Sequence, residues 1–216
     1  MVESVIGKDE APKPQVPPPW WRSLKLMPCG ESKYLRSRGL ETPAALRWSA
    51  SVPYFEDGVQ TGNYPAMLGP IVRAGKFITW HCTYLQNGQK AAVPHPRKIL
   101  APGIHGAAIP LYPFDGGELG VAEGIETAIA AHMLYKVPVW ATLNAGNMAA
   151  FEWPEGITTL QIFADRDANY AGLAAAYALA HRAAKMKLDV MVYLPQREGD
   201  FNDELTRQEP PCTESK

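Results

Sequence analysis

Residues 158–185 read TTLQIFADRDANYAGLAAAYALAHRAAK, and they give the clearest indication of the fold class. The apolar run 158–164 has the length and composition of one buried strand, and the alanine-rich run 171–185 is typical of a helix. Two aspartates, Asp165 and Asp167, lie between the two runs. A buried strand, an acidic turn and a helix in this order predict one unit of a parallel sheet that helices cover on both faces.

The same alternation continues on both sides of this stretch. We expect further strands at 118–122, 137–142 and 189–194, a helix at 126–135 and a last helical turn at 202–206. Strands that alternate with helices are joined by crossover connections, so the sequence predicts a parallel α/β sheet.

The first half of the chain has a different pattern. Its short β-rich runs, 67–72 and 76–84, are broken by turn signals, and the Asn-Gly pair at 87–88 predicts a hairpin over 84–91. Residues 32–40 predict a short basic helix that ends at a glycine. We therefore divide the chain into a proline-rich tail (1–19), a smaller basic α+β lobe (20–113), a parallel α/β domain (114–207) and a second tail (208–216).

The composition is that of a folded protein. The 216 residues are 46% hydrophobic and 20% charged, which is enough apolar content for a core. No window approaches the roughly 18 consecutive apolar residues of a bilayer span, and the N-terminus lacks the pattern of a signal peptide. We expect a cytoplasmic protein without membrane contact.

The formal net charge of −1 conceals two opposite halves. Residues 20–110 contain 11 Lys or Arg and 4 Asp or Glu, whereas residues 111–209 contain 7 and 14. The resulting charges of +7 and −7 are typical of a chain that binds nucleic acid or another charged ligand.

The three cysteines, Cys29, Cys82 and Cys212, lie far apart and form no C-x-x-C pair. A structural zinc ion needs about four clustered Cys or His ligands, and only His81 adjoins a cysteine. We therefore expect no zinc, and scattered thiols are typical of a reducing compartment.

Acidic residues follow three of the predicted strands, at the sheet edge where functional groups collect in such folds. They are Glu123, Asp165 with Asp167, and Asp200 with Asp203. Each alone is most simply a helix N-cap. Two carboxylates about 4 Å apart repel by about 1 kcal/mol in water and about 4 kcal/mol at an effective dielectric near 20. Their convergence on one edge therefore favours a hard divalent cation such as Mg²⁺.

Three segments that contain these residues resemble the Toprim domain shared by bacterial-type primases, topoisomerases and some nucleases. They are VAEGIETAIAA (121–131), IFADRDANYAGLAAA (162–176) and GDFNDEL (199–205), and they are most similar to the primases of plasmids, phages and integrative elements. Upstream, YLRSRGL (34–40) and the run 83–113 resemble the basic lobe that precedes Toprim in those primases. The resemblance implies a Toprim (Rossmann-like) parallel sheet with flanking helices, preceded by that lobe.

The resemblance also implies an activity, that of a DNA primase catalytic core. Such a nucleotidyltransferase makes short RNA primers from ribonucleoside triphosphates on a single-stranded DNA template. Two divalent ions, Mg²⁺ or Mn²⁺, would take part. Asp165 and Asp167 would be metal ligands, and Glu123 would bind metal or act as a general acid and base.

The rest of the acidic site is less fully specified. By the same resemblance, Asp200 with Asn202 or Asp203 would complete it. Many primases have a further acidic residue four positions after the glutamate, where this sequence has Thr127. Glu126 is one position away, which leaves open whether it replaces the missing ligand of the second ion.

The basic half would hold the template backbone and the incoming triphosphates beside the metal site. The candidate cations are Arg36, Arg38, Lys90, Arg97 and Lys98, and for each the alternative is a plain surface cation. Full primases usually carry an N-terminal zinc-binding module, which this sequence lacks together with any helicase domain. We therefore expect either a trimmed catalytic core or a partner, such as a replicative helicase or a separate zinc-binding chain that chooses the template.

Other functions remain alternatives. A Toprim nuclease would use the same acidic residues but usually accompanies an ATPase domain, and the sequence contains no P-loop. A topoisomerase would need a large additional domain, and a D-x-D phosphatase would place its nucleophile after the first strand. A module that only binds single-stranded nucleic acid is the alternative from another class, and the three acidic clusters argue against it.

Overall fold

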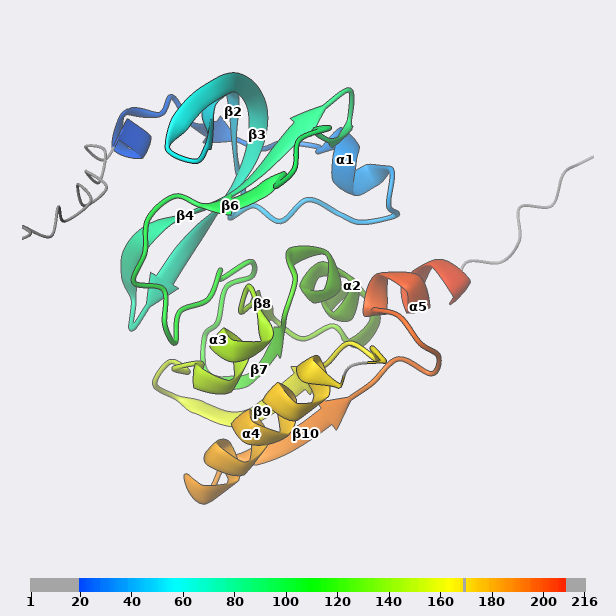
Figure 1. The fold of residues 1–216 in the computed structure, drawn as a ribbon. Helices are drawn as coiled ribbons and strands as arrows, with labels where there is room; N and C mark the ends of the chain where they lie inside the picture. Colours follow the sequence, from blue (N-terminus) through cyan, green and yellow to red (C-terminus); the bar gives the residue numbers. More distant parts are fainter. Residues whose placement is uncertain (1–19, 169, 209–216) are drawn as a thin grey trace, which may run out of the picture.

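The computed structural model describes residues 20–168 and 170–208. Two lobes lie one above the other, and the N-terminal part of the chain forms the upper lobe in Figure 1. The predicted tail 1–19, nearly all of the tail 208–216, and Cys212 lie outside the described residues. None of the described helices is both long enough and apolar enough to cross a membrane.

The upper lobe is an antiparallel sheet with strand order β1-β2-β3-β4-β5, in which β6 also pairs with β4. Its elements are η1 (Trp20–Ser23), β1 (Met27–Pro28), α1 (Lys33–Arg36), β2 (Arg47–Glu56), β3 (Val59–Arg73), β4 (Lys76–Gln86), β5 (Gln89–Lys90) and β6 (Arg97–Ile99). The predicted hairpin is present, because Leu85 pairs with Lys90. Its turn residues Asn87 and Gly88 have φ values of 53° and 77°, as a two-residue turn of type I′ requires.

Two features of the upper lobe differ from the sequence prediction. β2 and the first half of β3 are strands although both contain proline. Pro53 lies between two register shifts of the β2–β3 pair. Irregular pairing at such shifts tolerates a residue without an N–H. The helix predicted over 32–40 is only the single turn α1. Leu40 N–H donates to the Leu35 carbonyl at 3.0 Å, and Gly39 has a φ of 70°, so a left-handed cap ends the helix early.

The lower lobe is a parallel sheet with strand order β10-β9-β7-β8. Its elements are β7 (Gly117–Ala122), α2 (Ile125–Tyr135), β8 (Val139–Ala141), α3 (Ala145–Ala150), β9 (Ile157–Phe163), α4 (Ala171–Lys185), β10 (Asp189–Tyr193) and α5 (Phe201–Gln208). α2 packs with α5, and α3 packs with α4 on the other face of the sheet (Figure 1). The predicted parallel sheet with helices on both faces is confirmed, and the sequence patterns missed only the short helix α3 in this lobe.

The strand order creates a crevice at the carboxyl ends of β7 and β9. The chain adds β8 on one side of β7 and then β9 and β10 on the other side. The connections that follow β7 and β9 therefore leave toward opposite faces, which separates them at the top of the sheet. Glu123 follows β7 directly and Asp165 follows β9 closely, so the fold delivers both carboxylates to this crevice.

Small residues allow α4 to pack closely on the sheet. Its buried positions recur every three or four residues, as in a helix with one face in the core: Gly172, Ala175, Ala176, Leu179 and Ala183. Asp165 and Asp167 lie in the loop that joins β9 to α4.

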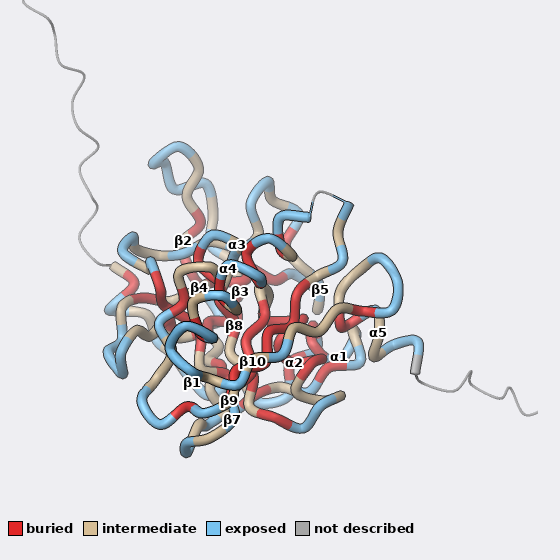
Figure 2. Tube along the Cα trace, turned by 90° about the horizontal axis from the view of Figure 1, so that it is seen from below, coloured by how far each residue is buried: buried red, intermediate tan, exposed pale blue. Residues whose placement is uncertain are grey.

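One hydrophobic cluster and two pairs of backbone hydrogen bonds join the two lobes. Ala108 exchanges backbone hydrogen bonds with Val72 of β3 (2.8 and 3.0 Å), and Ile109 exchanges them with Ala141 of β8 (2.8 and 3.1 Å). Residues of both lobes belong to the same buried cluster, and Figure 2 shows buried segments gathered in the middle of the molecule. Packing and backbone hydrogen bonds therefore hold the lobes in one arrangement.

Candidate active site between the two lobes

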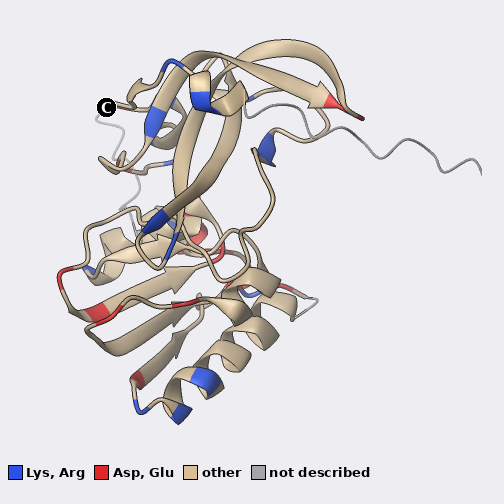
Figure 3. Cartoon of the chain, turned by 90° about the vertical axis from the view of Figure 1, so that its left-hand side faces the viewer, with Lys and Arg blue, Asp and Glu red and all other residues tan. Residues whose placement is uncertain are grey.

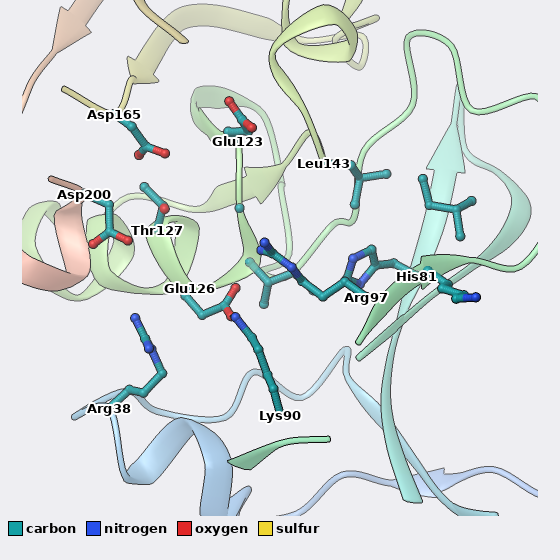
Figure 4. Close-up of a pocket in the computed structure, with 14 residues that line it drawn as sticks. Arg38, His81, Lys90, Arg97, Glu123, Glu126, Thr127, Leu143, Asp165 and Asp200 are labelled. Carbon is teal, nitrogen blue, oxygen red and sulfur yellow. The ribbon is translucent and has the colours of Figure 1, made fainter. Parts of the chain in front are cut away.

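A cavity of about 540 Å³ lies between the lobes, above the crevice of the parallel sheet (Figure 4). The upper lobe contributes Arg38, His81, Lys90, Arg97, Lys98 and Ile99, and the lower lobe contributes Glu123, Gly124, Ile125, Glu126, Thr127, Leu143, Asp165 and Asp200. Every lining cation belongs to the upper lobe and every lining carboxylate to the lower lobe, and Figure 3 shows how charged residues are distributed over the two lobes. The two halves of opposite charge thus meet at this cavity.

Four of the predicted acidic residues form a group that we call the acidic cluster: Glu123, Asp165, Asp167 and Asp200. Three of them line the cavity. Asp167 is not among the lining residues, but its charge acts on both Asp165 and Glu123. The structure therefore brings together carboxylates from three separate segments of the sequence.

The acidic cluster is electrostatically strained. Burial, together with the charges of the other three carboxylates, raises the pKa of the Asp165 carboxyl to about 7. Burial and the charge of Asp167 also raise the pKa of Glu123, while Arg97 acts in the opposite direction. Carboxylates withdrawn from water destabilise one another's ionised forms, so the cluster lacks positive charge.

The free oxygens of this cluster suit a hard divalent ion. Oδ1 of Asp165 and Oδ1 of Asp167 are buried and have no hydrogen-bond partner among the described residues. Carboxylate oxygens are the ligands that Mg²⁺ prefers, and it often uses only one or two of them. No three His, Cys, Asp or Glu side chains within 20–168 and 170–208 form a complete ligand set. The residues therefore fit an ion whose remaining positions are taken by water or substrate oxygens.

Thr127 supports the cluster from the first turn of α2. Its hydroxyl makes a hydrogen bond to the Asp165 carboxylate, which lowers the pKa of Asp165 in part. Thr127 lies at the position where the resemblance leads one to expect an acidic residue. In this chain the position holds a hydrogen-bond donor to a carboxylate in place of a further carboxylate.

The segment before α5 is tied to the loop after β9. Arg166 and Gly199 exchange two backbone hydrogen bonds, both of 3.0 Å. Asp203 Oδ2 accepts from the Asp200 N–H at 3.2 Å, and Asp200 Oδ1 accepts from the Asp203 N–H at 2.9 Å. The two carboxylates therefore cap the start of α5 reciprocally, and of the two only Asp200 lines the cavity.

Asn202, another predicted site residue, joins the two lobes. Its side chain is 4% exposed, and its amide donates to the Arg38 carbonyl at 2.9 Å. Asn202 is not among the residues that line the interlobe cavity. The structure thus places it beneath a basic residue of the site, as a contact that positions that residue.

The five predicted cations separate into two groups. Arg38, Lys90, Arg97 and Lys98 line the cavity, but Arg36 does not. Arg36 is exposed to solvent and lies 3.1 Å from the carboxylate of Glu31. The structure therefore assigns Arg36 to the surface.

Lys98 is anchored within the upper lobe. Its ammonium donates a hydrogen bond to the Phe55 carbonyl and lies 4.3 Å from the centre of the Tyr54 ring. Arg38, Lys90 and Arg97 instead extend toward the carboxylates on the other side of the cavity (Figure 4). Of these, Arg38 and Arg97 are the better placed to meet a ligand, because Lys90 is paired with Glu126.

Glu126 is a buried carboxylate whose partners come from the upper lobe. Tyr34 donates its hydroxyl hydrogen to Glu126 Oε1 at 2.5 Å, and Lys90 Nζ lies 3.1 Å from the same oxygen. Burial alone would raise the pKa of Glu126, but the Tyr34 hydrogen bond and the Lys90 charge outweigh it and bring the pKa to about 2. We call Tyr34, Lys90 and Glu126 the interlobe cluster, and it links the upper lobe to the first turn of α2.

Two further lining residues have no signal in the sequence. His81 has its pKa lowered to about 4, because burial disfavours its charged form. Leu143 has a φ of 80°, which a bulky side chain rarely adopts, and its N–H donates to the Glu123 carbonyl at 2.7 Å. Strained backbone of this kind is common at functional sites. Both features depend on contacts between distant segments, so no motif reveals them.

The family comparison agrees with the geometry of the lower lobe. The Toprim domain family matches residues 118–210, which contain the whole acidic cluster. The chain carries a Toprim domain. A domain of unknown function matches residues 20–111, which form the upper lobe. None of the curated proteins matches this Toprim chain.

Solved primase structures share the fold of both lobes. The primase fragment of the bacteriophage T7 primase-helicase protein has a TM-score of 0.56 and 15% identity, over 87% of this chain and 72% of that one. The DnaG primase catalytic domain bound to single-stranded DNA has a TM-score of 0.54 and 16% identity, over 88% and 74%. The DnaG catalytic core has 0.54 and 16%, over 81% and 67%. The predicted Toprim primase fold is confirmed.

Proposed function

We propose that this Toprim chain is a DNA primase catalytic core, a nucleotidyltransferase that joins ribonucleotides on a single-stranded DNA template. The observation that carries the proposal is the interlobe cavity, in which an acidic cluster with unpartnered oxygens faces cations of the other lobe. Template-directed synthesis needs both parts, because cations hold phosphates and divalent ions assist the transfer. The shared fold with solved primases supports the proposal.

The residues present indicate where the ions would bind. When bound, two Mg²⁺ or Mn²⁺ ions would favour the attacking 3′ hydroxyl and stabilise the leaving pyrophosphate. Asp165 and Asp167 would hold them through their unpartnered oxygens, with Asp200 beside them. Thr127 would orient the Asp165 carboxylate through its hydrogen bond.

The remaining residues have distinct tasks in the transfer. The 3′ oxygen of the primer forms a bond to the α-phosphorus of the incoming triphosphate, the bond from that phosphorus to the bridging oxygen breaks, and pyrophosphate leaves. Glu123 is suited to accept the 3′ proton, because its raised pKa makes it a stronger base than an exposed glutamate. Arg38 and Arg97, which face the acidic cluster, would hold phosphates of the template backbone and of the incoming triphosphate.

A primer-synthesis assay on the unmodified chain tests the proposal. We expect labelled short RNA that requires single-stranded DNA, ribonucleoside triphosphates and Mg²⁺ or Mn²⁺. Asp165→Asn should lower the rate about 1,000-fold, which corresponds to about 4 kcal/mol of transition-state stabilisation. Asp189→Asn is the matched control, since Asp189 is exposed at the amino end of β10, and it should retain activity.

The other outcomes of this assay contradict the proposal. Loss of the template strand would indicate a Toprim nuclease that uses the same cluster. Template binding without synthesis or cutting, including in the presence of a replicative helicase or a zinc-binding partner chain, would indicate a binding module.

A further inference from the structure

One end of the interlobe cavity carries an imidazole and apolar side chains in place of carboxylates. His81 of β4 pairs with Ile99 of β6, and both line the cavity together with Leu143. Figure 4 shows His81 and Leu143 on the side of the cavity away from Asp165. A ligand that fills the cavity would therefore meet the acidic cluster at one end and these uncharged groups at the other.

The alternation of β4 directs His81 toward this cavity. The next residue, Cys82, and Tyr84 belong to a buried cluster within the upper lobe, and successive side chains of a strand point to opposite faces. His81 therefore points toward the lower lobe. Its Nδ1 is buried without a hydrogen-bond partner among the described residues, and no described residue bonds to Nε2. The accessible nitrogen, Nε2, is thus free to meet a ligand.

The His81 ring is neutral at pH 7. Burial lowers its pKa to about 4, although the charge of Glu126 acts in the opposite direction. A neutral imidazole carries one N–H donor and one acceptor nitrogen. We assign the hydrogen to Nε2, because a buried N–H without an acceptor is rarer than a buried acceptor without a donor. His81 therefore offers one N–H to the cavity and no positive charge for a phosphate.

The backbone at Leu143 is a second, independent indication of a ligand at this end. Its φ of 80° is unfavourable for a leucine, and its N–H donates to the Glu123 carbonyl at 2.7 Å. Strain of this kind persists only where the surrounding structure enforces it, and it is common at ligand sites. The strained turn ties the uncharged end of the cavity to the residue that is suited to accept the 3′ proton.

The proposed reaction indicates which part of a nucleotide would occupy the uncharged end. The carboxylates and arginines of the cavity suit ions and phosphates, so the nucleoside of an incoming triphosphate would extend toward His81. A template-directed enzyme accepts bases with different edges, whereas every ribonucleotide carries the same 2′ hydroxyl. A single N–H at a fixed position can therefore serve all of these substrates alike through the sugar.

We propose that His81 donates a hydrogen bond from Nε2 to the ribose 2′ hydroxyl of the incoming ribonucleoside triphosphate, and that this contact favours ribonucleotides over deoxyribonucleotides. This inference rests on the proposed primase function and adds the residue that selects the sugar. His81 is a substrate-binding residue in this account, and it neither holds an ion nor moves a proton.

Nucleotide binding to the full chain tests this contact without any synthesis. In calorimetric titrations with Mg²⁺ present, the unmodified chain should bind ATP about 5-fold more tightly than 2′-deoxy-ATP, which corresponds to about 1 kcal/mol for one hydrogen bond. His81→Leu should bind ATP as weakly as 2′-deoxy-ATP, with the affinity for 2′-deoxy-ATP unchanged. His81→Gln supplies an amide N–H in place of the imidazole N–H and should retain a preference for ATP.

A second histidine and a second analogue provide the controls. His95 is exposed and does not line the cavity, so His95→Leu should bind both nucleotides as the unmodified chain does. 3′-Deoxy-ATP should bind to the unmodified chain as tightly as ATP. An equal loss of affinity for ATP and 2′-deoxy-ATP in His81→Leu would overturn the inference, and so would a preference that depends on the 3′ hydroxyl.

Primer synthesis separates this inference from the proposed function. In His81→Leu, the ratio of kcat/KM for ATP to that for 2′-deoxy-ATP should fall about 5-fold. RNA synthesis with an unchanged ratio would contradict the role of His81 and leave the primase activity standing. A preference for ATP that requires His81, in a chain that makes no RNA, would support the contact and contradict the primase activity.

Discussion

The acidic cluster and the interlobe cluster border the same cavity, but they shift the pKa of a buried carboxylate in opposite directions. At Asp165, burial and neighbouring carboxylates raise the pKa to about 7, and one oxygen has no partner among the described residues. At Glu126, a hydrogen bond from Tyr34 and the charge of Lys90 outweigh burial, and the pKa falls to about 2. A buried carboxylate therefore marks a ligand site only where its compensating donors are missing.

The first prediction tests the interlobe cluster by removing the Glu126 carboxylate. Glu126→Ala leaves the Lys90 ammonium and the Tyr34 hydroxyl without their shared acceptor, so the free energy of unfolding at pH 7 should fall by about 3 kcal/mol. Tyr34→Phe removes only one hydrogen bond to the carboxylate and should cost about 1.5 kcal/mol. Urea unfolding of the two variants beside the unmodified chain measures both values.

The pH dependence of this cluster provides a check. The folded pKa of Glu126 lies below its ordinary value of 4.5, so its stabilisation is present above about pH 4.5 and is lost as the pH falls toward 2. If Glu126→Ala unfolds at the same urea concentration as the unmodified chain at pH 7, the interlobe cluster does not hold the lobes together.

The second prediction concerns Asp165, whose pKa is shifted in the opposite direction to that of Glu126. The folded pKa of about 7 exceeds the ordinary 3.8, so the native state binds more protons than the unfolded state between these values, and stability falls as the pH rises through this window. In metal-free buffer at pH 8, Asp165→Asn should therefore stabilise the chain by about 2 kcal/mol. The gain should disappear below about pH 4, where Asp165 is protonated in both states. Thermal unfolding at pH 8 with chelator would contradict this if the variant were less stable.

A third prediction compares two neighbouring arginines and has the smallest expected effect. Arg38 lines the cavity, whereas Arg36 pairs with Glu31 at the surface. Arg38→Ala should weaken binding of single-stranded DNA and reduce the slope of log affinity against log salt concentration by about 1. Arg36→Ala should change that slope little, because exposed ion pairs contribute about 0–1 kcal/mol. Equal slopes for the two variants would remove Arg38 from the proposed path of the nucleic acid.

Much of the lower lobe could be predicted because its signals are local. The strand and helix around Asp165 and Asp167 follow from apolar runs and alanine-rich periodicity, and parallel strands necessarily bring their carboxyl ends to one edge. The upper lobe was harder to predict, because β2 and β3 contain prolines and bulges that weaken the strand pattern. The single-turn helix α1 was predicted too long for a related reason, since only its left-handed cap fixes its end.

The division of the site into two carboxylate clusters could not be predicted. Glu126 and Thr127 are adjacent in sequence, and nothing local shows that one binds Tyr34, 92 positions away, while the other binds Asp165. The same limit applies to Asn202, whose partner Arg38 is 164 positions away in the sequence. Such roles are set by how the lobes pack, which depends on contacts between distant segments.

Divalent-ion binding tests the comparison most directly. We would titrate Mn²⁺ into the unmodified chain, Asp165→Asn and Glu126→Gln and measure bound ion by electron paramagnetic resonance. The acidic cluster should bind Mn²⁺ in the unmodified chain, Asp165→Asn should lose this binding, and Glu126→Gln should keep it. Loss of binding in Glu126→Gln with retention in Asp165→Asn would show that the interlobe cluster holds the ion and would contradict the account.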